Sequence, residues 1–302
     1  MIRLANELEN VKTVAVAGHI RPDGDCTGSC LAVYSYLQEN FPEISVDVYL
    51  EMVNPNFLFL KGAAQVKTSC EEDRGYDLFI ALDASEKERL GGAVKYFETA
   101  GKTLCIDHHI TNPGFAEQNW VDAQASSTAE LVYQALEEDK ISKETAEAVY
   151  LGIIHDTGVF QYSNTTPRTM QIAGRLMAKG IDFSRIIEDT FYRKTYVQNQ
   201  VLGRALMESI LLLDGKIIVG RIRQKDMSFY GVGPADLEGI VSQLRVTAGV
   251  EVAIFHYETG TQEYKASLRS NGIVDVSAVC SYFGGGGHVK AAGCTMHGSL
   301  YD

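Results

Sequence analysis

The sequence predicts an α/β protein with two domains, an N-terminal parallel sheet flanked by helices and a smaller C-terminal α/β domain. Over residues 1–190, short apolar and β-branched runs alternate with helical stretches, which is the pattern of a doubly wound parallel sheet. Beyond residue 205 the runs are separated by hairpin turns instead. A chain of 302 residues can bury a core in each domain. We expect domains at 1–190 and 205–302, joined by a polar linker at 191–204.

The first domain is expected to contain four strands, at residues 13–18, 45–50, 77–82 and 102–106. Each is an apolar run of the kind found in buried parallel strands. A helix at 26–40 follows the first strand, so the chain begins with a strand, a polar loop and a helix. Further helices are expected at 127–137, 142–156, 167–179 and 183–191.

Three of these strands lead into ionisable side chains. His19, Asp23 and Asp25 follow the first strand, Asp83 follows the third, and the Asp-His-His triplet at 107–109 follows the fourth. Ionisable residues are poor strand formers, and the carboxyl ends of parallel strands line the crevice in which α/β proteins bind ligands. We therefore expect a functional site at this edge. For the triplet alone, a polar turn with one capping aspartate is the alternative.

The helix at 142–156 ends in His155 and Asp156. A carboxylate at the C-terminal end of an apolar helix is unfavourable for the helix dipole and costly to bury. A bound metal would offset both costs, and a C-terminal capping network is the alternative. We interpret His155 as a packed or supporting histidine.

The second domain is expected to consist of strands paired in hairpins. Asp214-Gly215 and Thr259-Gly260 are typical hairpin turns. The four glycines at 284–287 stop the last helix. The expected elements are strands at 216–220, 250–257 and 263–268, a helix at 276–283, and a final strand after His288.

Composition is that of a globular protein, with 45% hydrophobic and 22% charged residues. There is no apolar run of about 18 residues and no signal-peptide pattern at the start, so we expect neither a membrane span nor secretion. The six cysteines have no regular spacing, which favours reduced thiols and a cytoplasmic location.

The negative charge is concentrated in the first domain. Residues 1–190 hold 16 Lys and Arg against 29 Asp and Glu, whereas residues 191–302 hold 11 against 10. A net charge of -12 argues against a surface that coats nucleic acid. An anionic substrate would be repelled by the first domain unless bound divalent cations neutralised it.

The ionisable residues at the element ends form a candidate ligand set of imidazoles and carboxylates without a thiolate. Such a set suits Mn²⁺ or Mg²⁺, with Co²⁺ and Zn²⁺ as further options. So many carboxylates in one crevice could not all stay ionised without cations. Two divalent cations bridged by a carboxylate suit phosphoester hydrolysis. The alternative is an unrelated collection of caps and turns. The set is His19, Asp23, Asp25, Asp83, Asp107, His108, His109 and Asp156.

In this order, these residues resemble the four motifs of the DHH phosphoesterase superfamily. Phe283 and the glycines before His288, followed by Ala-Ala-Gly at 291–293, resemble the signature of the associated DHHA1 domain. The similarity spans residues 13–294. A two-domain chain of this size is most similar to the bacterial nano-RNase branch, which degrades short oligoribonucleotides and dephosphorylates 3′-phosphoadenosine 5′-phosphate (pAp).

The resemblance implies two Mn²⁺ ions that share Asp83. It implies that His109 contacts the phosphate and protonates the leaving group, and that Asp107 orients an imidazole. The implied ligands are His19, Asp23 and Asp83 for one ion, and Asp25, Asp83, His108 and Asp156 for the other.

The second domain is expected to bind the substrate. Glycines let backbone N–H groups approach a phosphate or a base, and Arg269 could clamp a terminal phosphate; a surface ion pair is the alternative for Arg269. Tyr162, Ser163 and Asn164 line the cleft or form a simple turn, and His256 and His297 are structural or solvated. The expected substrate-binding residues are Arg269, Ser270, Gly285, Gly286, Gly287 and His288.

The resemblance implies a cytoplasmic, Mn²⁺-dependent phosphodiesterase and phosphomonoesterase, with Mg²⁺ or Co²⁺ as alternative metals. It would release 5′-mononucleotides from short oligonucleotides, RNA preferred, and convert pAp to AMP; a homodimer is also compatible. The alternatives are a phosphodiesterase for cyclic di-AMP or a linear dinucleotide and a non-catalytic nucleotide sensor. A manganese pyrophosphatase would share the metal ligands, but the DHHA1-like signature argues against it.

Overall fold

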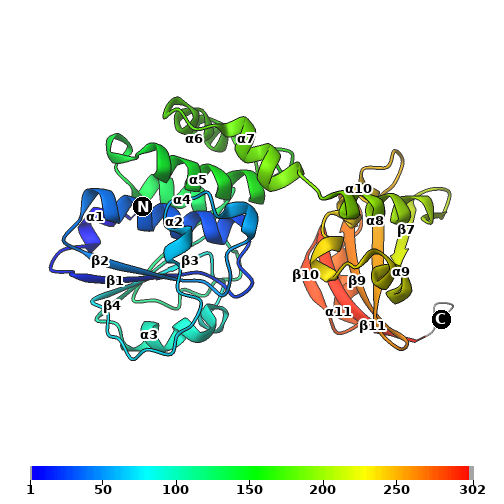
Figure 1. The fold of residues 1–302 in the computed structure, drawn as a ribbon, viewed down its shortest axis with the longest axis horizontal. Helices are drawn as coiled ribbons and strands as arrows, with labels where there is room; N and C mark the ends of the chain where they lie inside the picture. Colours follow the sequence, from blue (N-terminus) through cyan, green and yellow to red (C-terminus); the bar gives the residue numbers. More distant parts are fainter. Residues whose placement is uncertain (1, 299–302) are drawn as a thin grey trace. The chain divides into compact units, whose positions relative to one another are not determined.

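The computed structural model describes residues 2–298. The chain divides into two compact units, one ending at Arg193 and the other beginning at Lys194. The first is built on a parallel sheet and the second on a mixed sheet (Figure 1). The expected fold class is therefore confirmed.

The first unit contains a five-stranded sheet of order β2-β1-β3-β4-β5, in which all neighbours are parallel. All four expected strands are present. The fifth, β5, was not expected, because it has only four residues and begins with Gln118 and Asn119, so it has no apolar run; it pairs with β4. The strands are β1 (Thr13–Ala17), β2 (Ser45–Tyr49), β3 (Leu78–Leu82), β4 (Lys102–Asp107) and β5 (Gln118–Val121).

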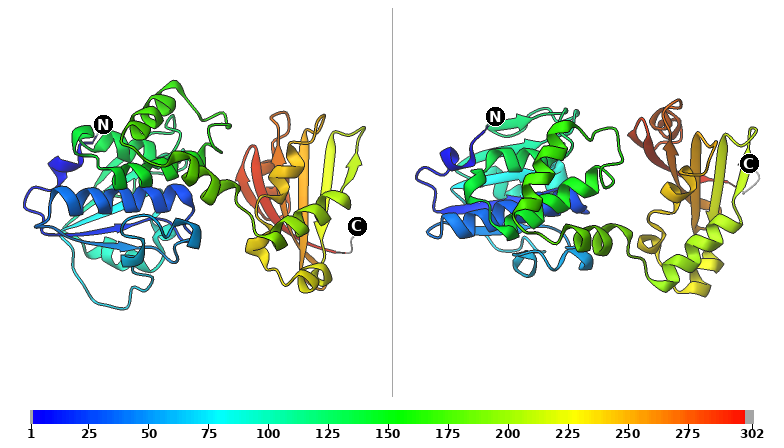
Figure 2. Two further views of the ribbon diagram at one scale, coloured as in Figure 1. Left: turned by 45° about the horizontal axis from the view of Figure 1, so that its top comes forward. Right: turned by 90° about the horizontal axis from the view of Figure 1, so that it is seen from above.

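Helices cover both faces of this sheet (Figures 1 and 2). Alternate strand residues face opposite sides: Val16 and Ile80 pack in the core under α2, α4 and α5, whereas Phe79 packs against Phe97 of α3. Helices α6 and α7 pack on α5, away from the sheet. The helices are α1 (Leu4–Glu7), α2 (Gly24–Asn40), α3 (Val94–Thr99), α4 (Thr128–Ala135), α5 (Lys143–Asp156), α6 (Pro167–Ala178) and α7 (Phe183–Ile187), followed by a π-helical turn, η5 (Glu188–Tyr192).

The second unit contains a six-stranded sheet of order β10-β11-β9-β8-β7-β6. Strands β7 and β8 are parallel, and the other neighbours are antiparallel. Both expected hairpins are present, as β6–β7 and β8–β9, but the second turns at Thr261 and Gln262, because Thr259 and Gly260 belong to β8. The strands are β6 (Ile210–Leu212), β7 (Ile217–Ile222), β8 (Val252–Gly260), β9 (Glu263–Ser270), β10 (Gly286–His288) and β11 (Ala291–His297).

The helices of this unit correct the expected linker at 191–204. Most of that segment is helical, in α8, which begins with a capping box between Thr195 and Gln198. Val201 and Ala205 of α8 are buried in the core of the second unit. The segment is therefore an amphipathic helix, and its many polar side chains led to the wrong prediction of a linker. The helices are α8 (Tyr196–Met207), α9 (Gln224–Tyr230), α10 (Ile240–Arg245) and α11 (Val276–Tyr282).

The glycine run is also more ordered than a loop. Its last two glycines and His288 form β10, which pairs with β11. Gly287 has a φ of +145°, and a side chain on Gly285 or Gly287 would collide with the backbone of β11. Glycine is therefore required at these two positions by packing alone, whereas a Cβ on Gly286 would meet open space.

Among residues 2–298, no helix has the length and apolar character needed to cross a membrane.

Candidate metal centre

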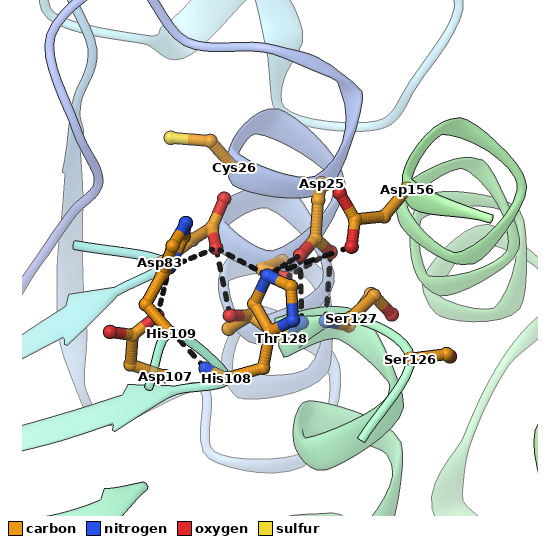
Figure 3. Close-up of polar contacts among 12 residues, drawn as sticks. Asp25, Cys26, Asp83, Asp107, His108, His109, Ser126, Ser127, Thr128 and Asp156 are labelled. Atoms are coloured by element: carbon orange, nitrogen blue, oxygen red, sulfur yellow. Dashed lines mark hydrogen bonds and ion pairs between the residues drawn. The ribbon is translucent and has the colours of Figure 1, made fainter. Parts of the chain in front are cut away.

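The ionisable residues expected at the element ends lie together at one edge of the first unit's sheet. Figure 3 shows part of this set: Asp25, Asp83, Asp107, His108, His109 and Asp156. His19 follows β1, Asp83 follows β3, and β4 ends at Asp107. The sheet is parallel, so these carboxyl ends meet. The ends of α2 and α5 contribute Asp25 and Asp156.

The first cluster consists of His19, Asp23 and Asp83. His19 Nε2 lies 3.7 Å from Asp23 Oδ2 and 3.5 Å from Asp83 Oδ2. The Nδ1–H of His19 donates to the carbonyl oxygen of Ile20 at 2.8 Å. This bond orients the ring so that Nε2 points at the carboxylates, as expected for a histidine that binds a metal through Nε2.

The second cluster consists of Asp25, Asp83, His108 and Asp156. His108 Nε2 lies 3.6 Å from Asp83 Oδ1 and 3.6 Å from Asp156 Oδ2. It lies 3.9 Å from Asp25 Oδ2. Asp83 thus belongs to both clusters and presents Oδ2 to the first and Oδ1 to the second. This is the arrangement of a carboxylate between two cations.

Asp83 is held in place by its backbone and by Thr128. Its φ of +55° lies in the left-handed region, which Asp tolerates better than most residues. Thr128 Oγ1 donates to Asp83 Oδ1 at 2.9 Å. The backbone N–H groups of Thr128 and Ala129 donate to the two oxygens of Asp25 at 2.7 and 2.9 Å.

Sequence reasoning missed this role of Thr128. The N-terminus of α4 points at Asp25, and a helix N-terminus stabilises a carboxylate there. The signal was a capping motif, in which Ser127 accepts from the backbone of Glu130. A cap predicts where a helix begins, but not that the next residue will contact a distant strand end.

Asp107 orients His109 rather than His108. The Nδ1–H of His109 donates to Asp107 Oδ1 at 2.8 Å, and Asn112 Nδ2 donates to Asp107 Oδ2 at 2.7 Å. Burial raises the pKa of Asp107, but the hydrogen bonds from His109 and Asn112, together with the charges of the two histidines, lower it overall. Burial lowers the pKa of His109, but the bond to Asp107 and the nearby carboxylates raise it overall.

The remaining carboxylates repel one another. Burial, followed by the charges of Asp83 and Asp156, raises the pKa of Asp25 well above its usual range. Burial is also the main cause that raises the pKa of Asp156 to about 7. Burial lowers the pKa of His19, but hydrogen bonds to Asp23 and Asp83 raise it to about 10. Without cations the centre would bind protons in their place, so the residues present fit divalent metal ions.

An unusual turn follows Asp156. Gly158, Val159 and Phe160 all have φ between +55° and +64°, which is rare for a β-branched residue. Val159 and Phe160 pack against the main core, so side-chain packing stabilises this backbone. Strained backbone of this kind is found near functional sites, and here it ends α5 directly after a candidate ligand.

His155 packs as expected for a supporting histidine. Its Nε2 lies 3.1 Å from Thr190 Oγ1, and its ring makes edge contacts with Phe57 and Phe191. Burial lowers the pKa of His155 to about 4, so its ring is neutral.

The predicted ligand set contains no thiol, and the structure places the thiol of Cys26 beside two of its members. Ligand atoms of His19, Cys26 and Asp83 all lie within 4.8 Å of one another. Cys26 follows Asp25 in the first turn of α2, and its sulfur lies on the Asp83 side of the centre (Figure 3). Sequence reasoning missed it because a cysteine in an apolar helix is typical of a plain core residue.

The expected substrate-binding residues lie in the second unit. His288 pairs with Ala291, and Ala291 pairs with Arg269. Directly paired residues share a face of a sheet, so Arg269 and His288 lie on the same face, two strands apart. Ser270 is buried, and its hydroxyl donates to Glu251 at 3.0 Å. Because Glu251 also accepts from the backbone of residues 272–274, the side chain of Ser270 has a structural role.

Tyr162, Ser163 and Asn164 form part of a turn after α5. Asn164 Nδ2 donates to the backbone oxygens of Ser126 at 2.8 Å and Asp156 at 3.1 Å. Asn164 therefore connects the strained turn to the segment before α4.

Comparisons with known proteins agree with this architecture. Residues 13–153 match the N-terminal domain of the DHH family, and residues 214–300 match the DHHA1 domain. The chain is 28% identical to the bifunctional oligoribonuclease and PAP phosphatase NrnA of Thermus thermophilus over 96% of this chain and 86% of the relative. It is 26% identical to the Bacillus subtilis protein of that name, over 94% and 90%.

The structure also resembles that of an exopolyphosphatase-related protein from Bacteroides fragilis. The TM-score is 0.89 at 25% identity, over 99% of this chain and 91% of the other. The chain belongs to the DHH family, with a DHHA1 domain as its second unit.

Proposed function

We propose that the protein is a Mn²⁺-dependent phosphoesterase that releases 5′-mononucleotides from short oligoribonucleotides and dephosphorylates pAp to AMP. The main observation behind this proposal is that the two carboxylate oxygens of Asp83 face two separate clusters of candidate metal ligands. The relatives named as oligoribonuclease and PAP phosphatase support the choice of substrates.

The two clusters are the proposed cation sites. His19, Asp23 and Asp83 would hold one ion, and Asp25, Asp83, His108 and Asp156 the other. When bound, two such ions activate water for attack and neutralise the charge of the phosphoryl group. This neutralisation matters here, because the first 190 residues hold 29 acidic side chains against 16 basic ones.

His109 is the proposed acid. Asp107 and Asn112 hold its position through a chain of hydrogen bonds. Since Asp107 accepts the Nδ1 proton, the proton on Nε2 is the one that His109 gives to the leaving oxygen. Its raised pKa favours the protonated ring that this role requires.

Arg269 and His288 are proposed to bind the substrate from the second unit. Both lie on one face of its sheet, two strands apart, and a cation and an imidazole on one face suit a phosphate and a base. Gly286, which has open space above it, would let a phosphate approach the backbone of β10. The balanced charge of residues 191–302 removes the repulsion that an anionic substrate meets elsewhere.

The test is a product time course after removal of metals with a chelator. The substrates are labelled RNA dinucleotide to pentanucleotide, pAp, linear pApA and cyclic di-AMP, each with and without Mn²⁺. We expect mononucleotides from the short RNAs and AMP from pAp, only when Mn²⁺ is present. Hydrolysis of cyclic di-AMP or pApA alone would replace this proposal with a dinucleotide phosphodiesterase. Tight nucleotide binding without any product would replace it with a sensor.

A further inference from the structure

Cys26 occupies a position that a plain core cysteine would not. Its side chain is fully buried, yet its sulfur faces an imidazole and a carboxylate as well as apolar groups. Ligand atoms of His19, Cys26 and Asp83 lie within 4.8 Å of one another. Three donors of different chemistry therefore surround one small volume beside the first cluster.

Gly18 makes room for this sulfur. A Cβ at Gly18 would overlap Cys26 Sγ and lie 3.3 Å from Cys30 Sγ. The Sγ of Cys26 also lies 3.8 Å from the carbonyl oxygen of His19, to which the thiol donates. The end of β1 thus holds the sulfur next to the backbone of the ligand His19, where a larger residue at position 18 would displace it.

We propose that the first cluster is also a binding site for thiophilic divalent cations, such as Cd²⁺, Zn²⁺ or Co²⁺, with Cys26 as a thiolate ligand. The imidazole of His19 and a carboxylate oxygen of Asp83 are the other two ligands. Asp23 lies 3.7 Å from His19 Nε2 and supplies a fourth donor. Four ligands from cysteine, histidine and carboxylate are a usual tetrahedral set for these ions.

Binding replaces a proton with a metal ion. The sulfur–metal bond forms as the thiol proton leaves to solvent, with no change of oxidation state. The cation supplies the driving force, since a coordinating thiol loses its proton. Mn²⁺ prefers oxygen and nitrogen ligands, so it gains little from Cys26, whereas a thiophilic ion gains a strong bond.

The second cluster provides the internal contrast. Its ligands, Asp25, Asp83, His108 and Asp156, offer only oxygen and nitrogen. This inference shares one premise with the proposed function, namely that the first cluster is one of two cation sites. It adds that the two positions differ in metal preference, and that thiophilic ions compete with Mn²⁺ at one of them.

The experiment is a titration of the metal-free full chain with Cd²⁺, followed by ultraviolet absorbance. A cadmium–thiolate bond gives a charge-transfer band that carboxylates and imidazoles do not give. We expect the band in the wild type, saturating at one Cd²⁺ per chain. We expect no band in Cys26→Ser, and an unchanged band in the matched control Cys280→Ser, since Cys280 is a buried cysteine on a helix of the second unit.

Competition between Cd²⁺ and Mn²⁺ measures the metal preference of the first cluster. Cys26→Ser should weaken Cd²⁺ binding by at least about 10- to 100-fold, the range already found when a partner of a metal ligand is removed. Mn²⁺ affinity of this variant should stay close to that of the wild type, which also shows that the variant is folded. A wild type without the band, or a band that persists in Cys26→Ser, would overturn the proposal.

The absorbance does not depend on turnover, so the two proposals can fail separately. A cadmium–thiolate band in a protein that hydrolyses nothing would leave this site standing and reject the proposed function. Mn²⁺-dependent hydrolysis without the band would do the reverse.

Discussion

The two units differ in how far their candidate functional residues are exposed to solvent. In the first unit, His19, Asp25 and Asp83 are only 6%, 1% and 2% exposed, and each has several polar partners. In the second unit, His288 is exposed and Arg269 is half-buried. The candidate metal ligands are therefore shielded from solvent, whereas the two residues proposed to bind the substrate are more accessible. Substitutions in the first unit should therefore affect the chemistry strongly, and those in the second should affect affinity moderately.

The largest effect is expected from Asp83→Asn. It removes a charged ligand from both clusters, and since losing even a partner of one ligand costs about 10–100-fold, we expect activity to fall by on the order of 10³-fold or more. Asparagine also tolerates the left-handed backbone, so the melting temperature should not fall. Activity and calorimetric Mn²⁺ binding check this. Near-normal Mn²⁺ stoichiometry would contradict the shared role of Asp83.

A smaller loss is expected from Thr128→Val, which removes the hydrogen bond to Asp83 and keeps the side-chain shape. We expect Mn²⁺ affinity to fall by about 10–100-fold. Thr128→Ser keeps the hydroxyl and serves as the matched control. Equal Mn²⁺ affinities of the two variants, measured by calorimetry, would show that the hydroxyl does not position Asp83.

Arg269→Ala should act on affinity rather than on the metal centre. A hydrogen bond to a charged group is worth about 1.5–3 kcal/mol, so we expect KM for short oligoribonucleotides to rise about tenfold or more. Because Arg269 belongs to the second unit, metal content and kcat should stay near the wild type. Unchanged KM on every substrate would remove Arg269 from the proposed phosphate site.

The smallest effects are expected in the glycine run at residues 284–287, where alanine substitutions can show which glycines are needed for packing and which for substrate binding. Gly287→Ala forces a side chain into a backbone with φ of +145° and against β11, and should lower the free energy of unfolding by about 1–3 kcal/mol. Gly286→Ala meets open space and should change it by less than about 0.5 kcal/mol. Urea unfolding of both variants tests this. A raised KM in a stable Gly286→Ala variant would assign that glycine to substrate binding, and a stable Gly287→Ala variant would contradict the packing argument.

The sequence predicted the sheet, its buried strands and the convergence of strand ends, because apolar runs and the topology of parallel sheets determine these features. It did not predict β5 or α8. The four residues of β5 are too short a run to stand out in the sequence, and they form a strand by pairing with β4. Helix α8 buries a narrow apolar stripe in the second core.

The sequence predicted the ionisable residues of the candidate site but missed Thr128 and Cys26, for a related reason. Residues at element ends stand out in a sequence, so the ionisable set could be found there. Thr128 and Cys26 lie in the first turns of α4 and α2, but they are not ionisable like the others, and a threonine or a buried cysteine there has an ordinary structural explanation. Both lie near Asp83, which is far from them in the chain, and no local pattern reports such contacts.

The left-handed turn after α5 should couple the packing of the core to the position of the candidate ligand Asp156. Apolar packing of Val159 and Phe160 keeps this backbone in a conformation that it would otherwise leave. When heat or a distant cavity-forming substitution loosens that packing, the turn should relax before the unit melts, and Asp156 would move with it. A decline in Mn²⁺ affinity at temperatures below the melting transition would then be the expected result.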